Sequence, residues 1–231
     1  MSDIKQAERI QTSILNAAEK KALVWLAKRQ PKWMTSDILT GIGFFGAVVI
    51  AAGYMLTGRN PAFLWLASLG LVINWYGDSL DGTLARVRNT QRPIYGYYLD
   101  HTVDGINESL MFIGIGLSGL MHLSVSLGIL VLYLLLTINV SVNAHLKKEF
   151  RLTYAKLGPT EFRILGIIAN TLLFFIRPFR EFTLDISVCG KDLTLYSLDL
   201  VGLAVILLLL VIHLVTIAGD ARYYAKIDPK K

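Results

Sequence analysis

The sequence has little of what a secreted, zinc-binding or soluble protein needs. It contains one cysteine, Cys189, so it cannot form an intrachain disulfide, and it has no Cys/His cluster with zinc-ligand spacing. Charged residues make up only 17% of the chain, against about 25% in soluble domains. The N-terminus lacks a charged stretch followed by a short apolar core, so we expect no cleavable signal peptide.

Hydrophobic residues, by contrast, make up 54% of the chain and recur in long runs. A run of about 17 to 25 apolar residues can cross the hydrocarbon core of a bilayer as a helix. The sequence therefore predicts an all-α integral membrane fold with six transmembrane helices. The expected spans are 38–57, 61–77, 97–121, 124–145, 162–176 and 198–218.

The net charge of +6 is distributed unevenly between the two sides of these spans. With both termini on one side, 19 of the 23 Lys and Arg residues fall there, in the termini and the connections after the second and fourth spans. Short cytoplasmic loops carry such an excess. We therefore expect a multi-pass protein of a bacterial inner membrane with both termini in the cytoplasm. Anionic membrane lipids are the expected partners of the basic residues, and nucleic acid is not.

The N-terminal segment, residues 1–33, is predicted to be an amphipathic helix in the cytoplasmic interface. Its apolar residues recur at steps of three or four: Ile4, Ala7, Ile10, Ile14, Ala18, Ala22 and Trp25. Such a basic, amphipathic helix suits an anionic leaflet, although a helix packed on a soluble partner is the alternative. Residues 34–222 form the expected transmembrane catalytic domain, and residues 223–231 a short basic tail.

Four carboxylates stand at the expected cytoplasmic ends of the second and third spans. Asp78 and Asp81 are three residues apart, and Asp100 and Asp104 are four apart, so each pair shares one helix face. A carboxylate near a bilayer centre costs about 2.5 to 3.5 kcal/mol, and less near the interface, so partners are needed. Four separate solvated or capping carboxylates are the alternative reading.

If the two faces converge, the carboxylates require protons or cations. Hard divalent ions prefer oxygen ligands. Two divalent ions balance the four negative charges of the carboxylates, so the sequence predicts two Mg²⁺ or Mn²⁺ ions. Gly82, Ala85 and Gly96 leave room for a substrate beside this site, and Arg86 can hold a phosphate through paired hydrogen bonds.

The complete pattern, D-x2-D-G-x2-A-R-x9-G-x3-D-x3-D over residues 78–104, resembles the signature of the CDP-alcohol phosphotransferase family at all eight fixed positions. This resemblance implies transfer of a phospho-alcohol from a CDP-linked donor to an acceptor hydroxyl, with release of CMP. It also implies two divalent metals and a homodimer. The metal ligands implied are Asp78, Asp81, Asp100 and Asp104. The residues implied to contact the CDP moiety are Gly82, Ala85, Arg86 and Gly96.

Two residues are candidates for the base that deprotonates the acceptor. Asp104 lies one helical turn from Asp100 on the same face, whereas His101 is rotated about 100° away from Asp100. A histidine next to the third aspartate resembles the choline and ethanolamine phosphotransferase branch, and an imidazole suits base catalysis near neutral pH. The sequence leaves Asp104 and His101 as alternatives.

Further polar residues border or interrupt the later spans. Basic residues near the fourth connection either hold an acceptor phosphate or only anchor spans: Lys147, Lys148, Arg151, Lys156 and Arg163. Asn139 and Asn143 are expensive in lipid and are expected to face the bundle.

Three functions remain open at this point. The first is transfer from CDP-diacylglycerol to a small polar acceptor. The second is transfer from a CDP-amino alcohol to a lipid acceptor, which His101 favours. The third is a cation transporter or channel with the acidic cluster in its path, although it gives no reason for the spacing of Gly82, Ala85, Arg86 and Gly96.

Overall fold

The computed structural model describes residues 8–10, 16–147, 149–151, 158–188 and 190–229. The helices are α1 (Asn16–Arg29), α2 (Ser36–Thr57), α3 (Phe63–Arg88), α4 (Pro93–Gly116), α5 (Leu123–Lys147), α6 (Pro159–Phe175), α7 (Arg177–Arg180) and α8 (Ser197–Ile227). The strands are β1 (Glu8–Ile10), β2 (Glu149–Arg151), β3 (Thr183–Val188) and β4 (Lys191–Tyr196).

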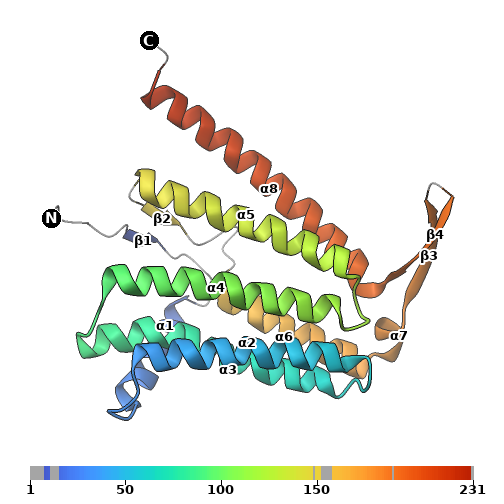
Figure 1. Ribbon diagram of the computed structural model, residues 1–231, viewed down its shortest axis with the longest axis horizontal. Coiled ribbons are helices and arrows are strands. Elements are labelled where there is room, and N and C mark those ends of the chain that lie inside the picture. The colour runs from blue at the N-terminus through green and yellow to red at the C-terminus, as the bar shows by residue number, and fades with distance from the viewer. Residues whose placement is uncertain (1–7, 11–15, 148, 152–157, 189, 230–231) are drawn as a thin grey trace.

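The long helices run back and forth along a common direction (Figure 1). Helix α2 packs against α3 and α4, α5 packs against α4 and α8, and α3 also contacts α1 and α6. The α3–α4 connection lies at the same end of the bundle as the C-terminal end of α8, and the β3–β4 hairpin projects from the opposite end (Figure 1). The connection between the two motif-bearing helices and the β3–β4 hairpin therefore lie at opposite ends of the bundle (Figure 1).

Each expected span overlaps one helix, but the helices differ in apolar character. Helices α2, α5 and α8 are long and apolar enough to cross a membrane. Helix α6 has only 17 residues, and α3 and α4 carry the acidic motif residues along part of their length. A count of six spans therefore stays a prediction.

Helix α3 is longer than the expected span 61–77. It continues without a break to Arg88 and ends at Asn89, whose backbone is left-handed with φ 53° and whose N–H bonds the carbonyls of Ala85 and Arg86. Asparagine tolerates this conformation at a helix end. The first half of the motif therefore lies on a continuous helix.

Helices α2 and α3 approach closely through glycines. A Cβ on Gly77 would lie 2.2 Å from the backbone nitrogen of Gly43, and one on Gly46 would lie 2.4 Å from that of Asn74. Small residues of this kind let helix backbones meet in membranes. The contact fixes α3 against α2 at the start of the motif.

Replacing Gly77 by alanine should therefore separate the two helices. Overpacking of a tight site costs about 1 to 3 kcal/mol, so we expect the melting temperature of the detergent-purified Gly77→Ala variant to fall. Gly41→Ala on α2 is the matched control, because a Cβ there meets nothing within 4 Å among the described residues. Equal melting temperatures for the two variants would contradict this packing.

The strands correct the expectation of a purely helical fold. Strands β3 and β4 form an antiparallel hairpin in which Leu184 pairs with Leu195 and Ile186 pairs with Leu193. Period-two alternation around Gly190, whose φ is +77°, favours such a hairpin. Strands β1 and β2 form a second, parallel pair.

Helix α1 is shorter than the helix expected over 1–33, because Glu8–Ile10 form strand β1 instead. Ile4, Ala7 and Ile14 lie outside the described residues. Leu23 and Ala27 are buried in one cluster with Leu80 and Leu84 of α3. One face of α1 is therefore docked on the C-terminal half of α3, which carries the first half of the motif.

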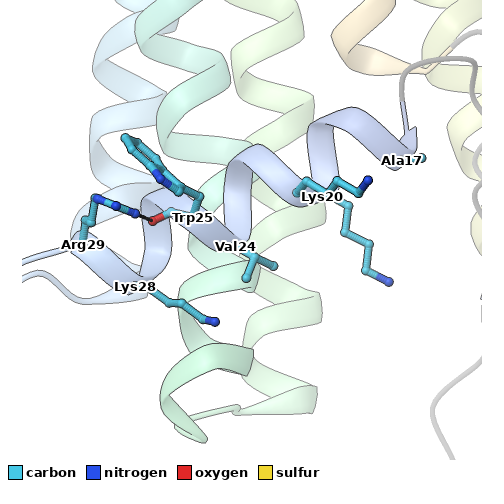
Figure 2. A pocket seen from close by; sticks show the side chains of 7 residues that line it. Ala17, Lys20, Val24, Trp25, Lys28 and Arg29 are labelled. Carbon is cyan, nitrogen blue, oxygen red and sulfur yellow. Dashed lines mark hydrogen bonds between the residues drawn. The ribbon is translucent and has the colours of Figure 1, made fainter.

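The outer face of α1 carries the expected residues Ala18, Ala22 and Trp25, all exposed. Figure 2 shows the basic side chains Lys20, Lys28 and Arg29 along this helix, and the Trp25 ring lies 3.8 Å beneath the Arg29 guanidinium. The groove on this face has a volume of about 570 Å³. It is lined by Ala17, Lys20, Lys21, Val24, Trp25, Lys28 and Arg29.

Candidate active site

Three of the four motif carboxylates meet between α3 and α4. Oxygen atoms of Asp78, Asp100 and Asp104 all lie within 4.8 Å of one another, and each residue is partly buried. Asp104 interacts electrostatically with both Asp78 and Asp100. The two halves of the motif, far apart on separate helices, therefore come together in space.

This donor set fits a hard divalent cation. Ionised carboxylates within 4.8 Å of one another repel unless one of them is protonated or a cation lies between them. A Mg²⁺ or Mn²⁺ ion bound by oxygen atoms removes that repulsion without a proton. Within the residues that the structure describes, Asp78, Asp100 and Asp104 are the group with this potential.

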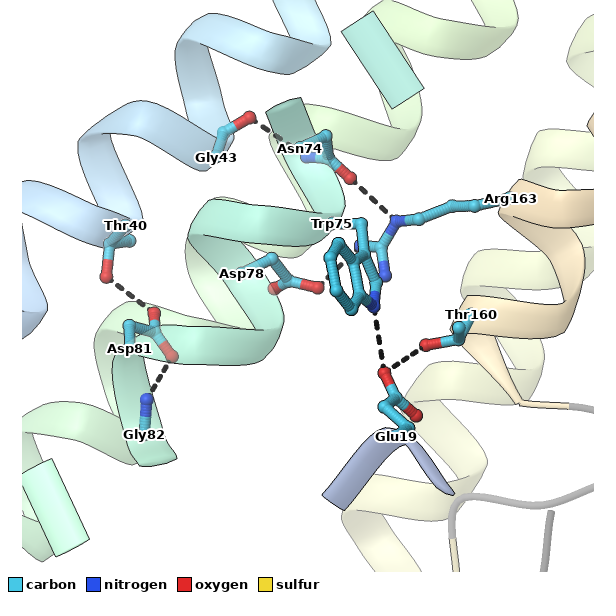
Figure 3. Close-up of polar contacts among 10 residues, drawn as sticks. All are labelled: Glu19, Thr40, Gly43, Asn74, Trp75, Asp78, Asp81, Gly82, Thr160 and Arg163. Atoms are coloured by element: carbon cyan, nitrogen blue, oxygen red, sulfur yellow. Dashed lines mark hydrogen bonds and ion pairs between the residues drawn. The ribbon is translucent and has the colours of Figure 1, made fainter. Parts of the chain in front are cut away.

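Asp81 lies beside this group and is held by other contacts. Its Oδ2 accepts a hydrogen bond of 2.7 Å from the Thr40 hydroxyl of α2, and its Oδ1 accepts one from the Gly82 N–H (Figure 3). Its charge still interacts with those of Asp78 and Asp100. Asp81 is therefore positioned by α2 at the edge of the cluster.

Arg163 of α6 reaches into the cluster from the opposite side (Figure 3). Its Nη2 lies 2.5 Å from Oδ2 of Asp78, and the two side chains are only 14% and 19% exposed. Its Nε donates to Oδ1 of the fully buried Asn74 at 2.9 Å, and Asn74 in turn donates to the Gly43 carbonyl at 2.9 Å. The geometry thus assigns Arg163 a contact with the carboxylates. Lys148 and Lys156 lie outside the described residues.

The small motif residues leave open space, unlike the glycines that pack α2 on α3. A Cβ on Gly82 would meet Arg86 Nη1 at 3.5 Å, and one on Gly96 would meet no described atom within 4 Å. Arg86 is hydrogen-bonded through Nη2 to the Thr83 hydroxyl at 2.9 Å. Ala85 lies on the same helix, partly buried. Helix packing therefore does not explain Gly82 and Gly96.

His101 is oriented differently from the aspartates. Its Nδ1 lies 3.0 Å from the Tyr97 carbonyl and 3.7 Å from Oδ2 of Asp100, and its ring stacks on Tyr97. It lines a groove of about 630 Å³ between α4 and α5, together with Gly105, Leu134, Thr137, Ile138, Ser141, Val142, His145 and Leu146. Asp104, not His101, belongs to the carboxylate cluster.

Two polar residues of the site were not singled out from the sequence. Glu108 of α4 lies one turn beyond Asp104, and Tyr133 of α5 interacts electrostatically with it. The i, i+4 spacing from Asp104 was a usable signal for Glu108. Tyr133 gave no such signal, because its role depends on how α5 packs against α4.

Glu19 of α1 is a third residue that sequence reasoning missed. Its Oε1 accepts a hydrogen bond of 3.0 Å from Trp75 Nε1 on α3 and another from the Thr160 hydroxyl on α6 (Figure 3). Arg88 near the end of α3 donates to the carbonyls of Gln30 and Pro31, each at 2.9 Å. Helix α1 is thereby fastened along the part of α3 that carries the motif.

Asn139 and Asn143 face the neighbouring helix α8. Asn143 Nδ2 donates to Oδ2 of Asp220 at 2.7 Å and Asn139 Nδ2 to the same atom at 3.3 Å, while the Tyr224 hydroxyl donates to Asn143 Oδ1 at 2.8 Å. These contacts join α5 to α8 away from the carboxylates. They agree with a packing role.

Comparison with known proteins places this site in a family. Residues 33–218 match the CDP-alcohol phosphatidyltransferase family. Cholinephosphotransferase 1 of Xenopus laevis is 26% identical over 189 residues, which cover 78% of this chain and 42% of that protein. Phosphatidylinositol phosphate synthase of Cutibacterium acnes is 34% identical over 86 residues, which cover 36% of this chain and 38% of that protein.

A third relative is the archaetidylinositol phosphate synthase of Pyrococcus horikoshii. It is 32% identical over 93 residues, which cover 40% of this chain and 46% of that protein. The chain therefore matches less than half the length of each of these relatives. The family match covers most of the chain, including every motif residue from Asp78 to Asp104. The protein is an integral membrane protein and a member of the CDP-alcohol phosphatidyltransferase family.

Proposed function

We propose that the protein transfers a phospho-alcohol from a CDP-alcohol donor to an acceptor hydroxyl in phospholipid synthesis, with release of CMP. The observation that carries this proposal is the convergence of Asp78, Asp100 and Asp104 within 4.8 Å beside the open glycines of the motif. A cation transporter would use the carboxylates, but it would not need open space at Gly82 and Gly96.

We propose Asp78, Asp81, Asp100 and Asp104 as ligands of two divalent ions, Mg²⁺ or Mn²⁺. Bound there, such ions would neutralise the diphosphate and polarise the phosphoryl group that is transferred. The grouping of Asp78, Asp100 and Asp104 within 4.8 Å supports this assignment, because ionised carboxylates this close to one another repel unless a cation lies between them.

The chain's own residues have separate tasks in the transfer. Gly82, Ala85 and Gly96 allow the CDP moiety to approach the helix backbones, and Arg86 binds a phosphate oxygen. Asp104 takes the proton of the acceptor hydroxyl as that oxygen attacks the β-phosphorus of the donor. CMP leaves with the α-phosphorus.

His101 is the alternative base. Its Nδ1 lies 3.0 Å from the Tyr97 carbonyl, and an Nδ1–H that donates there leaves Nε2 as the unprotonated nitrogen of the neutral ring. If His101 acts, the acceptor approaches from the groove between α4 and α5 that this residue lines. Its position outside the carboxylate cluster favours Asp104.

Two pairs of donor and acceptor are candidates for this reaction. CDP-diacylglycerol with a small polar acceptor and a CDP-amino alcohol with a lipid acceptor both use the same site. The cited relatives carry names of both kinds, a cholinephosphotransferase and two phosphate synthases.

We also propose the membrane arrangement in which this reaction takes place. Six helices cross the bilayer, with 34–222 as the catalytic domain, 223–231 as a cytoplasmic tail and a homodimer as the assembly. Helix α1 lies in the cytoplasmic interface, where the basic groove in Figure 2 faces anionic head groups.

Cysteine labelling tests the orientation. In a Cys189→Ser background, a cysteine at Thr90, exposed between α3 and α4, should react with an impermeant thiol reagent only in permeabilised cells. A cysteine at Arg59, exposed between α2 and α3, should react in intact cells. The reverse pattern would refute a cytoplasmic active site.

Release of CMP tests the reaction class. Purified protein with Mg²⁺ should release CMP from CDP-diacylglycerol or from a CDP-amino alcohol when an acceptor is present. The Asp100→Asn variant should not, and Asp185→Asn on the hairpin at the other end of the bundle should behave like the wild type. Cation flux through vesicles without CMP release would favour a transporter.

A further inference from the structure

Glu19 of α1 contacts two helices of the catalytic domain with a single oxygen atom. Its Oε1 accepts a hydrogen bond of 3.0 Å from Trp75 Nε1 on α3 and another from the Thr160 hydroxyl on α6, as Figure 3 shows. Hydrogen bonds to a carboxylate are stronger than those between neutral groups. The Glu19 carboxylate therefore bridges α3 and α6.

This bridge lies one helical turn from the ion pair between Arg163 and Asp78. Trp75 precedes Asp78 by three residues on α3, and Thr160 precedes Arg163 by three residues on α6. Residues three apart on a helix are neighbours on one face. The Glu19 bridge and the ion pair therefore connect the same two helices at adjacent levels, and the bridge limits how far these helices can separate there.

The middle of α6 is held by other contacts. The Tyr54 hydroxyl of α2 donates to Asn170 Oδ1 at 3.0 Å, and Asn170 Nδ2 donates to the Ser68 hydroxyl of α3 at 3.1 Å. All three residues are buried. Removal of Glu19 is therefore expected to loosen the first turns of α6, where Arg163 lies, without detaching the helix.

The orientation of the Asp78 carboxylate depends on Arg163. Arg163 Nη2 lies 2.5 Å from Asp78 Oδ2, and Arg163 Nε donates to Oδ1 of the buried Asn74 at 2.9 Å, so the guanidinium is fixed at two points. Side chains that contact a metal ligand orient it, and their loss costs about 10- to 100-fold in metal affinity or activity. A displacement of Arg163 therefore changes how Asp78 presents its oxygens to a cation.

We propose that Glu19 is a positioning residue of the metal site, which acts through Arg163 on the Asp78 carboxylate. Because Glu19 joins α3 to α6, the guanidinium on α6 stays against the carboxylate on α3. This inference rests on the proposed role of Asp78 as a metal ligand. Glu19 lies outside residues 33–218, the part of the chain that matches the family, so the match assigns it no role.

Equilibrium binding of Mn²⁺ to the purified protein tests this proposal without turnover. The electron paramagnetic resonance signal of free Mn²⁺ gives the concentration at half saturation. We expect Glu19→Ala to raise this concentration at least about tenfold, the lower end of the range for a lost partner of a metal ligand. Glu19→Gln should bind Mn²⁺ nearly as tightly as the wild type, because an amide oxygen can accept both hydrogen bonds.

Two further variants separate positioning from general stability. Thr160→Val removes the hydroxyl that joins α6 to Glu19, so it should weaken Mn²⁺ binding in the same direction as Glu19→Ala, by a smaller factor. Tyr54→Phe is the matched control, because it removes a hydrogen bond to α6 away from Arg163. It should lower the melting temperature and leave Mn²⁺ binding unchanged.

Unchanged Mn²⁺ binding by folded Glu19→Ala protein would contradict the proposed role of Glu19. An equal loss of binding in Glu19→Gln, which keeps both hydrogen bonds, or in Tyr54→Phe would contradict it as well. If instead the wild type and Asp78→Asn bind Mn²⁺ equally, the proposed metal site itself is wrong, whatever the Glu19 variants show.

Discussion

Asp104→Asn is expected to lower turnover by at least about a hundredfold, in line with the loss of a general base. Asp104 lies in the carboxylate cluster with Asp78 and Asp100, so it is placed both to hold a cation and to accept the acceptor's proton. Binding of the CDP donor, which we assign to Arg86 and the motif glycines, should persist. Steady-state CMP release and equilibrium donor binding measure the two effects separately.

His101→Ala is the comparison that makes this result informative. Since His101 contacts the Tyr97 carbonyl and lies outside the carboxylate cluster, its removal should cost much less turnover. An inactive His101→Ala variant beside an active Asp104→Asn variant would reverse the assignment of the base. It would also favour an amino-alcohol donor.

Removal of divalent ions is expected to abolish turnover, and Mg²⁺ or Mn²⁺ should restore it. The physical reason is that Asp78, Asp100 and Asp104 bring three carboxylates within 4.8 Å, where their mutual repulsion needs a cation. The measurement is CMP release after EDTA treatment and dialysis, followed by titration with each ion.

Asp78→Asn and Asp100→Asn should each remove most turnover even at saturating Mg²⁺, with expression unchanged. Asp37→Asn is the matched control, because Asp37 is exposed and pairs only loosely with Arg92 at 3.8 Å. Full activity after exhaustive chelation would end the proposal of a metal-dependent transfer.

The sequence predicted the parts of the fold that depend on local pattern. Apolar runs are long enough to mark helices α2, α5 and α8, and the spacings of Asp78 with Asp81 and of Asp100 with Asp104 predicted a shared site. The expected span 61–77 covers only the apolar first part of helix α3, because the polar motif residues follow Gly77. The helix itself continues to Arg88, since nothing before Asn89 breaks it.

The features that were missed either depend on tertiary packing or follow the two-residue periodicity of a strand instead of the periodicity of a helix. The β3–β4 hairpin was overlooked although Leu184, Ile186, Leu193 and Leu195 alternate around a glycine turn. The Arg163 contact with Asp78 joins residues 85 positions apart, which no local pattern reveals. In the sequence, Arg163 is one of five basic residues near the connection between the fourth and fifth expected spans.

The part played by α1 shows the same limit. Its exposed stripe of Ala18, Ala22 and Trp25 could be read from the sequence, but its attachment to α3 and α6 through Glu19 could not. Hydrogen bonds from Trp75 and Thr160 to one carboxylate require three helices to be in place. The sequence therefore located the motif, whereas the structure shows what holds it.

The most direct test of the central claim follows the two phosphorus atoms of the donor. Purified protein receives CDP-diacylglycerol, and in a separate reaction CDP-choline, radioactively labelled either at the phosphorus next to cytidine or at the phosphorus next to the alcohol, with Mg²⁺ and an acceptor. We predict that the first label appears only in CMP and the second only in the new phospholipid, and that neither product forms with Asp100→Asn. Both labels remaining in intact donor, or the second label appearing in a product without the acceptor, would contradict phospho-alcohol transfer.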